Sequence, residues 1–340
     1  MKNILYKLRT LFGMNYKSFF KTINMVHERC GKSKIWIFFD IIRCQIKYGS
    51  GHNDYRLFAF YDMTDKQKDT YLTRVRNKKI IEYLNDQEYR DIFDNKALFN
   101  ERFKKYLKRD TADINKLSLE EFDKFINKHK IIFCKPACGD SGRGIERLSI
   151  KDFKTTKEMY NYIKEKNINV LEQVIIQHKD MSKVNSACVN CMRLVTVVNG
   201  KNVDVIYGVV KFGGGKSFVD NMSYGTMSCP IDLKTGKIYA NGQTEHEEVF
   251  KEHPVSNVYY IDFQIPCFKE AVKLVKEAAL EIPTVRQVGW DIGISENGPV
   301  IVEGNDWTDY MFWQLPEHNP NKEGLMTYYR KIIKDKKITK

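Results

Sequence analysis

The chain has 340 residues, of which 42% are hydrophobic and 29% are charged, and its formal net charge at pH 7 is +13. This apolar content excludes a disordered chain and predicts one or two tightly associated globular units. No signal peptide and no run of 18 apolar residues is present, and the eight cysteines are spread through apolar segments. We therefore expect a cytoplasmic protein.

The excess of basic residues is compatible with several classes of binding partner. Lysines are scattered over predicted helices and no nucleic-acid-binding module is recognisable, so we expect no nucleic acid. Residues 2 to 23 alternate basic with apolar side chains, a pattern that suits peripheral contact with an anionic membrane, here the inner face. Packing of the apolar stripe on the protein's own core is the favoured alternative.

The first 130 residues are predicted to be mainly helical, and no strand–helix–strand pattern occurs among them. Helices are expected at residues 15 to 30, 34 to 47, 65 to 84, 86 to 93, 96 to 108 and 118 to 128. The clearest early loop is the run Gly49 to Asp54. Two further helices are expected at 151 to 166 and 267 to 281.

A glycine-rich segment follows a short apolar strand. Ile131 to Cys134 is predicted to be that strand, and Lys135 comes directly after it. Three glycines then fall within six positions, which lets backbone N–H groups surround an anion, and Lys135 supplies a positive charge. Neither the Walker A motif nor the dinucleotide fingerprint is matched. Taken alone, the segment could equally be a surface turn.

Two segments lie between this loop and the C-terminal part. Val170 to His178 is predicted to be an apolar strand interrupted by Glu172 and Gln173, and an ordinary edge strand is the alternative. Cys188 and Cys191 have zinc-like spacing, but no second Cys/His pair stands at a suitable distance. We therefore expect two packed thiols.

The run Gly289 to Asp306 predicts two short strands joined by a tight turn, with alternating apolar residues on one buried face. A three-residue loop with positive φ at Gly298 would place Asp291 opposite Glu303, whereas a two-residue loop would put them on different faces. Opposed carboxylates roughly 5 Å apart repel unless a cation neutralises them. Together with the amide of Asn305 they suit Mg²⁺. The alternative is a solvated hairpin face.

Taken in order, the lysine and glycine loop, the Leu-Glu-Gln-Val-Ile strand, the Asn-Cys-Met-Arg segment (190–193) and the final Asp…Glu-x-Asn hairpin resemble the ATP-grasp superfamily. The nearest likeness is to its branch associated with sugar transfer and polysaccharide biosynthesis, over roughly residues 90 to 315. The resemblance implies an α+β ATP-grasp fold in which two α+β subdomains clasp ATP. The expected divisions are a helical region (1–90), the catalytic domain (91–320, with a mobile glycine-loop subdomain at about 130–175) and a basic tail (321–340).

The resemblance also implies residue roles. ATP would be held by Lys96, Lys135, Gly139, Ser141, Gly142, Gly144, Glu172, Gln173 and Ile175. One or two Mg²⁺ ions, or Mn²⁺, would be held by Asp291, Glu303 and Asn305. Catalysis would involve Arg193, Lys211 and Asn221. An exposed lysine is the ordinary alternative for Lys96, and a paired charge on a sheet is the alternative for Lys211 and Asn221.

The implied reaction is ATP-dependent ligation of a carboxylate to an amine through an acyl phosphate, modifying a sugar or lipid-linked glycan precursor in cell-surface polysaccharide biosynthesis. Two other functions stay open: a glycan or small-molecule kinase with the same ATP site, and a catalytically silent nucleotide-binding partner of a glycosyltransferase. The chain departs from many superfamily members because it has no parallel α/β pattern before residue 130. The N-terminal contribution to substrate binding is therefore open.

Overall fold

The computed structural model describes residues 15–139, 144–214 and 225–339. The chain forms two compact units, one made of the segment up to Leu84 together with the segment from Asp309, and the other of Asn85–Thr308. No helix in these ranges is long and apolar enough to cross a membrane.

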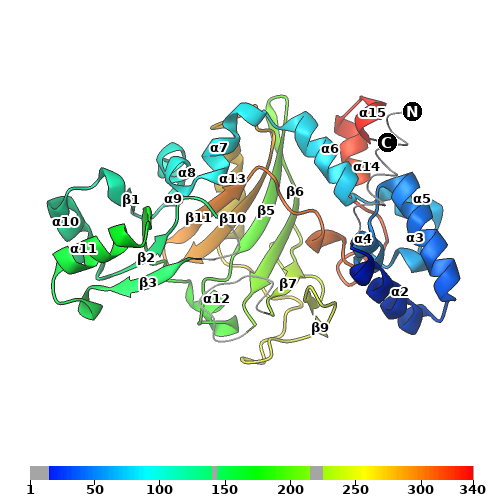
Figure 1. Ribbon diagram of the computed structural model, residues 1–340, viewed down its shortest axis with the longest axis horizontal. Coiled ribbons are helices and arrows are strands. Elements are labelled where there is room, and N and C mark those ends of the chain that lie inside the picture. The colour runs from blue at the N-terminus through cyan, green and yellow to red at the C-terminus, as the bar shows by residue number, and fades with distance from the viewer. Residues whose placement is uncertain (1–14, 140–143, 215–224, 340) are drawn as a thin grey trace. The chain divides into compact units, whose positions relative to one another are not determined.

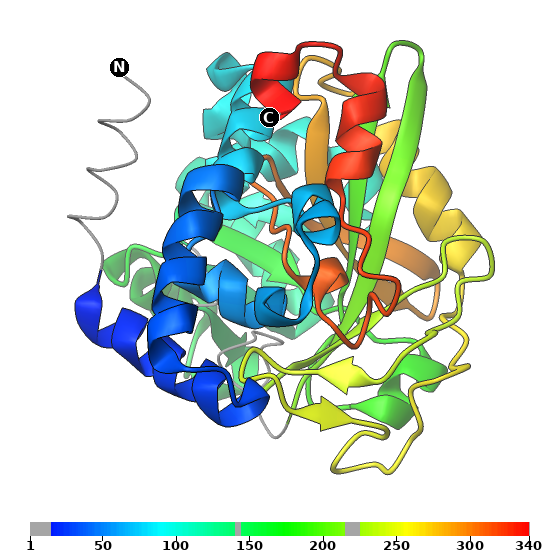
Figure 2. The same cartoon turned by 90° about the vertical axis from the view of Figure 1, so that its right-hand side faces the viewer.

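The first unit is helical. Its α-helices are α2 (Tyr16–Cys30), α3 (Lys34–Tyr48), α4 (His52–Leu57), α5 (Asp65–Thr70), α6 (Arg74–Leu84), α14 (Met326–Ile332) and α15 (Lys336–Thr339), with 3-10 turns η1 (Phe60–Asp62) and η6 (Phe312–Gln314). The side chains of Asn15 and Ser33 cap α2 and α3, and left-handed glycines, Gly31 and Gly49, end them. In Figure 2 the C-terminal helices, drawn in red, lie beside α6.

The core of this unit is rich in aromatic side chains, among them Phe19, Tyr48, Tyr55, Phe58, Phe60 and Tyr71. Phe19 and Ile23 are buried, so this part of the amphipathic N-terminal pattern packs on the protein's own core. Residues 2 to 14 of that pattern lie outside the described residues. Asp40 is buried among these groups and pairs with Lys68 at 2.9 Å.

The prediction of a single helix over 65–84 is wrong, because the chain is extended at Tyr71 between α5 and α6. Gln314 supplies the missing helical hydrogen bonds: its amide oxygen accepts from the Leu72 N–H at 2.9 Å, and its amide nitrogen donates to the Leu72 carbonyl at 2.9 Å. A residue 242 positions away thus satisfies the broken turn.

The second unit contains two antiparallel sheets (Figure 1). The smaller has the order β1-β4-β2-β3, with β1 (Thr111–Asp113), β2 (Ile131–Lys135), β3 (Glu146–Ser149) and β4 (Val170–Gln173). Helices α10 (Leu119–His129) and α11 (Thr156–Glu165) pack together and bury Phe122, Ile126, Met159 and Ile163 in the core of this sheet. 3-10 turns η3 (Ile114–Lys116) and η4 (Ile150–Asp152) lie beside them along the chain.

The larger sheet has seven strands in the order β11-β10-β5-β6-β7-β8-β9. These are β5 (Met192–Asn199), β6 (Asn202–Phe212), β7 (Met227–Pro230), β8 (Gly242–Gln243), β9 (Val249–Phe250), β10 (Gln287–Ser295) and β11 (Gly298–Asn305). Short helices precede or connect the sheets: η2 (Gln87–Tyr89), α7 (Arg90–Asp94), α8 (Lys96–Arg102), α9 (Lys104–Leu107) and α12 (Lys179–Val184). Every pair of named strands in the described residues is antiparallel, which confirms the α+β class.

The two faces of the larger sheet differ in polarity, because cross-strand partners share a face. One face carries Met192, Leu194, Val210, Phe212, Trp290 and Ile292 and packs under α13 (Phe268–Ala279). The opposite face carries Asp291, Arg193 and Lys211. Strand β10 is buried almost throughout, so the prediction that it has only one buried face is wrong. It lies between β11 and β5 instead of at an edge.

The hairpin places Asp291 opposite Glu303, as predicted, but by a different route. Ser295 pairs with Gly298, so the expected three-residue loop is wrong and the loop has two residues. A register shift follows between Asp291 and Ile292, because Ile292 pairs with Ile301 and leaves Val302 as an extra residue. This β-bulge returns the two carboxylates to one face. Gly298 does have positive φ, at 106°.

Candidate active site

Four charged side chains form a row across neighbouring strands of the polar sheet face. Glu303 on β11 is opposite Asp291 on β10, which in turn is opposite Arg193 on β5. The Arg193 guanidinium donates two hydrogen bonds to the Asp291 carboxylate, at 2.5 and 2.7 Å. Lys211 on β6 reaches the same carboxylate at 3.5 Å. Arg193 and Lys211 are only 13% and 12% exposed, so these charges interact in a partly desolvated setting.

The pKa values of the two carboxyl groups shift in opposite directions. Burial favours the neutral form of Asp291, but the charges of Arg193 and Lys211 outweigh it and hold its pKa well below the usual range. Burial and the negative charge of Asp291 together raise the pKa of Glu303, although Arg193 opposes this. Glu303 is therefore the carboxyl group in the row whose negative charge is least compensated.

A second charged cluster lies on the smaller sheet. The Lys135 ammonium at the end of β2 is 2.6 Å from the Glu172 carboxylate on β4, and Arg109 is 3.2 Å from the same group. Glu172 and Arg109 are almost fully buried, and Lys135 is 12% exposed. Burial alone would raise the pKa of Glu172, but the charges of Arg109 and Lys135 lower it to about 2. Glu172 is therefore ionised at neutral pH and fixes both cations.

Arg109 connects the two sheets and was missed by sequence reasoning. Besides Glu172, its guanidinium donates to the carbonyl oxygens of Ile301 and Val302, the latter at 3.1 Å. These carbonyls belong to the bulge that sets the Asp291–Glu303 register. In the sequence Arg109 follows a lysine-rich helix, and nothing there distinguishes it from a solvated cation. Only the tertiary structure reveals its role.

A cavity of 430 Å³ opens beside Lys135. Four residues predicted to bind ATP line it: Lys135, Glu172, Gln173 and Ile175. Its apolar wall comes from the smaller sheet, the connecting segments and the bulge, and includes Phe133, Ile145, Val174, Val189 and Val302. An apolar slot with a cation at one end and a backbone segment along one side has the form expected of a nucleotide site.

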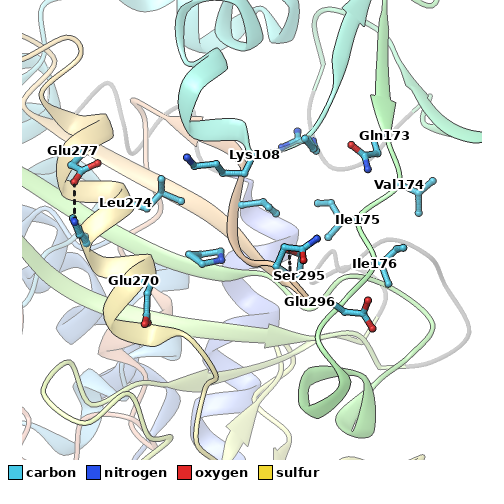
Figure 3. A pocket seen from close by; sticks show the side chains of 15 residues that line it. Lys108, Gln173, Val174, Ile175, Ile176, Glu270, Leu274, Glu277, Ser295 and Glu296 are labelled. Carbon is cyan, nitrogen blue, oxygen red and sulfur yellow. Dashed lines mark hydrogen bonds and ion pairs between the residues drawn. The ribbon is translucent and has the colours of Figure 1, made fainter. Parts of the chain in front are cut away.

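A larger cavity, of 550 Å³, lies on the other side of the connecting segment 173–176, which lines both cavities. Figure 3 shows it between Glu270, Leu274 and Glu277 of α13, the connecting segment, and Ser295 with Glu296 of the hairpin turn. Its lining includes neither Lys135 nor Glu172. The smaller cavity is therefore the better candidate for nucleotide binding.

The remaining predicted residues fall into two groups. Lys96 donates from its ammonium to the Gly139 carbonyl at 2.5 Å and from its backbone N–H to Ala137, so it contacts the start of the glycine loop. Gly139 and Gly144 both have positive φ. Asn305 lies two residues beyond Glu303, and its amide nitrogen is 3.5 Å from a carboxylate oxygen of Glu303. Ser141, Gly142 and Asn221 lie outside the described residues.

The two cysteines that suggested a zinc site are buried thiols that line the smaller cavity. The Asn185 amide nitrogen lies 3.2 Å from the Cys188 sulfur. Among the described residues, no group of three or more His, Cys, Asp or Glu side chains is arranged to hold a metal ion. The site predicted for Mg²⁺ has two carboxylates and an amide, and so falls below that count.

Several solved structures show remote similarity. The ATP-grasp ligase PsnB complexed with minimal precursor matches with a TM-score of 0.42 and 11% identity, over 70% of this chain and 62% of that chain. The ADP complex of PurK, N5-carboxyaminoimidazole ribonucleotide synthetase, matches with a TM-score of 0.39 and 11% identity, over 64% of this chain and 45% of that chain. The biotin carboxylase domain of Hydrogenobacter thermophilus 2-oxoglutarate carboxylase matches with a TM-score of 0.40 and 14% identity, over 67% of this chain and 46% of that chain. This chain thus spans less than two thirds of each, and likenesses this remote carry no argument about substrate or reaction.

A search of curated proteins found no match. The model of one protein family, described as sugar-transfer associated ATP-grasp, matches residues 75–334. That range covers well over half of the chain and contains both charged clusters, the smaller cavity and the bulged hairpin. The chain therefore belongs to the sugar-transfer associated ATP-grasp family and has the ATP-grasp fold.

Proposed function

We propose that the protein is an ATP-dependent carboxylate–amine ligase that acts through an acyl phosphate. The observation that carries this proposal is the row Glu303–Asp291–Arg193–Lys211 on one polar sheet face, with the Lys135 cavity nearby. Phosphoryl transfer needs positioned positive charge and carboxylates for a metal ion more than it needs a protein nucleophile. This arrangement supplies both.

The nucleotide would lie in the 430 Å³ cavity. Its adenine would occupy the apolar slot along Gln173 to Ile175, and Lys135 would contact the phosphates. Glu172 and Arg109 hold Lys135 in place, since the three form one buried charge cluster. The Lys96 ammonium contacts the Gly139 carbonyl, and Lys96 would supply a second cation to the phosphates.

Mg²⁺ fits the chemistry of Asp291, Glu303 and Asn305. Burial and Asp291 raise the pKa of Glu303, so a cation shared by the two carboxylates would relieve an unfavourable negative charge. All three side chains offer oxygen ligands of the type that Mg²⁺ prefers. When bound, the ion would neutralise charge on the ATP phosphates. Arg193 and Lys211 already hold Asp291 in position through short contacts.

In the reaction, the substrate carboxylate attacks the γ-phosphorus, the bond from that phosphorus to the β–γ bridging oxygen breaks, and ADP leaves. The amine then attacks the acyl carbon, phosphate leaves, and the amine loses a proton. Arg193 would steady the negative charge on the transferred group, because its planar fork can bind two oxygens at once. Asn221, which lies outside the described residues, is proposed to assist.

The sugar or lipid-linked glycan as acceptor is supported by the family description, which names an association with sugar transfer. The link to polysaccharide biosynthesis rests on the resemblance of the sequence motifs alone. A cytoplasmic location is part of the same proposal and rests on the sequence.

The decisive experiment measures ADP release from ATP with a panel of carboxylates and amines, alone and paired. A ligase requires one carboxylate and one amine, and oxygen-18 placed in the carboxylate must appear in the released phosphate. Transfer of phosphate to a hydroxyl would show a kinase. ATP binding without ADP release under any pairing would show a silent partner. Either of these outcomes would overturn the ligase proposal.

A further inference from the structure

Helices α2 and α3 of the first unit expose large apolar side chains. Ile35 is 72% exposed, Phe39 is 64%, Phe20 is 53% and Trp36 is 42%. Ile35 and Phe39 are four positions apart on α3, so they lie on the same side of that helix. A surface helix normally turns such residues toward the core and polar residues toward water. Contiguous exposure of this kind marks an interaction surface.

Ring contacts connect the exposed aromatic side chains of the two helices. Ring contacts run from Phe20 to Phe19 (5.7 Å between centroids), from Phe19 to Phe38 (5.6 Å) and from Phe38 to Phe39 (5.3 Å). The buried Phe19 and the partly buried Phe38 therefore link the exposed rings of α2 and α3. We call the exposed residues Phe20, Ile35, Trp36 and Phe39 the α2–α3 face.

The surroundings of the α2–α3 face are strongly basic. Residues 16 to 48 contain seven basic side chains and two acidic ones, and two of the basic ones, Arg43 and Lys47, pair with Asp65 of α5. Of the two acidic side chains, Asp40 is buried and paired with Lys68, whereas Glu28 is exposed. The Lys32 ammonium lies 4.2 Å from the centroid of the Trp36 ring. The exposed lysines of the two helices include Lys17, Lys21 and Lys34.

Charge distinguishes the candidate occupants of this face. Residues 1–14 of the same chain carry Lys2, Lys7 and Arg9 and no acidic residue, so they would add positive charge to a positive surface. A second copy of the chain would bring the same basic rim against itself. A bilayer containing anionic lipid offers the complementary sign to the lysines and an apolar layer to the aromatic rings.

We propose that the α2–α3 face docks the protein on anionic membranes. The rings of Trp36, Phe39 and Phe20 would lie at the boundary of headgroups and acyl chains, with the lysines at the headgroup level. This surface consists of described residues and shares none of them with the site proposed for ATP, so the proposal does not rest on the ligase function.

The test is co-sedimentation of the full chain with sucrose-loaded vesicles of phosphatidylcholine, with and without phosphatidylglycerol, in the absence of ATP. We expect binding to the vesicles that contain phosphatidylglycerol, weakened by salt. The double variant Ile35→Ser/Phe39→Ser should lower the partition coefficient by roughly tenfold or more, because two apolar groups no longer enter the bilayer. Lys17→Gln/Lys21→Gln/Lys34→Gln should lower it to a similar extent.

The matched control is Val255→Ser/Tyr259→Ser, which removes two side chains of similar exposure (70% and 67%) from the second unit. It should bind vesicles as the unmodified protein does, and thermal melting of all variants should show that they fold. Equal binding to both vesicle types, no binding, or equal losses in the control would overturn the proposal. A dimer that the Ile35→Ser/Phe39→Ser variant dissociates, without vesicle binding, would assign the face to a second copy instead.

Discussion

The two carboxylates of the charged row on the larger sheet, Asp291 and Glu303, have different neighbours. This difference predicts different roles for them. Asp291 is held by a bidentate arginine and a lysine, so its charge is already balanced. Glu303 has no cation of its own among the described contacts, and burial raises its pKa. A metal ion bound at the row would therefore depend most on Glu303, whereas Asp291 would be shared between the ion and Arg193.

Glu303→Gln is expected to lower turnover by at least about a hundredfold, the scale for losing a partner of transition-state charge. The fold should remain intact, because the amide has the same shape and places no new charge in the sheet. Glu296→Gln, in the exposed turn of the same hairpin, is the control and should retain activity. Steady-state rates at saturating ATP and Mg²⁺ decide the matter, and normal turnover of Glu303→Gln would refute the assignment.

Lys135 and Arg193 should separate in kinetics although both are cations. Lys135 lines the cavity proposed to bind the nucleotide, so Lys135→Ala should weaken ATP binding. Arg193 is proposed to act at the transferred group, so Arg193→Ala should spare ATP affinity and lower kcat, and Arg193→Lys should restore little. Calorimetry combined with single-turnover rates measures both. Loss of ATP binding in Arg193→Ala as severe as in Lys135→Ala would place Arg193 in the nucleotide cradle.

The helices and the hairpin show which features of the fold the sequence predicts correctly. Helix ends were predicted within a few residues where a capping side chain or a left-handed glycine marks them, as in α2 and α3. The opposition of Asp291 and Glu303 was predicted, yet the loop length behind it was wrong. The bulge carbonyls accept hydrogen bonds from Arg109, which lies 192 positions from Ile301 along the chain. The pattern of neighbouring residues in the sequence cannot predict a contact between residues so far apart.

Arg109 should therefore position the hairpin as well as Lys135. In Arg109→Met the bulge carbonyls lose their donor and Glu172 loses one of its two cations, so we expect a severalfold rise in the Mg²⁺ concentration needed for half-maximal turnover. Arg109→Lys should restore the charge beside Glu172 but not both carbonyl contacts, and so rescue only in part. Hydrogen exchange of the β11 amides gives a readout independent of turnover. Unchanged exchange and unchanged Mg²⁺ dependence would contradict the positioning role.

At the scale of the whole molecule, the sheet order and the composition of the two units lay beyond sequence reasoning. The segment from Asp309 on joins the N-terminal helices, because Tyr310 donates a 2.8 Å hydrogen bond to Asp54 and Asn319 donates one at 3.0 Å to Tyr71. Each of these hydrogen bonds joins residues about 250 positions apart. Amino-acid composition does not predict such contacts.

Asp54 should make stability depend on pH. Burial raises its pKa to about 6, although the Arg74 N–H and the Tyr310 hydroxyl oppose this. A carboxyl with a raised pKa contributes its full stability below the unfolded pKa, near 3.8, and loses it as pH rises through 6. The advantage of the wild type over Asp54→Asn in free energy of unfolding should thus shrink by up to about 3 kcal/mol between pH 4 and 7. Urea unfolding at several pH values measures it, and a constant difference would contradict this.

The contact between Gln314 and Leu72 also bears on synthesis. The N-terminal helices leave the ribosome first, yet the extended turn between α5 and α6 obtains its hydrogen bonds only when residue 314 has emerged, 242 positions later. At about 5–20 residues per second, this delay is on the order of tens of seconds. Residues 85–308 can therefore fold while α5 and α6 still lack their C-terminal partner, so these helices precede that unit in synthesis but are completed after it.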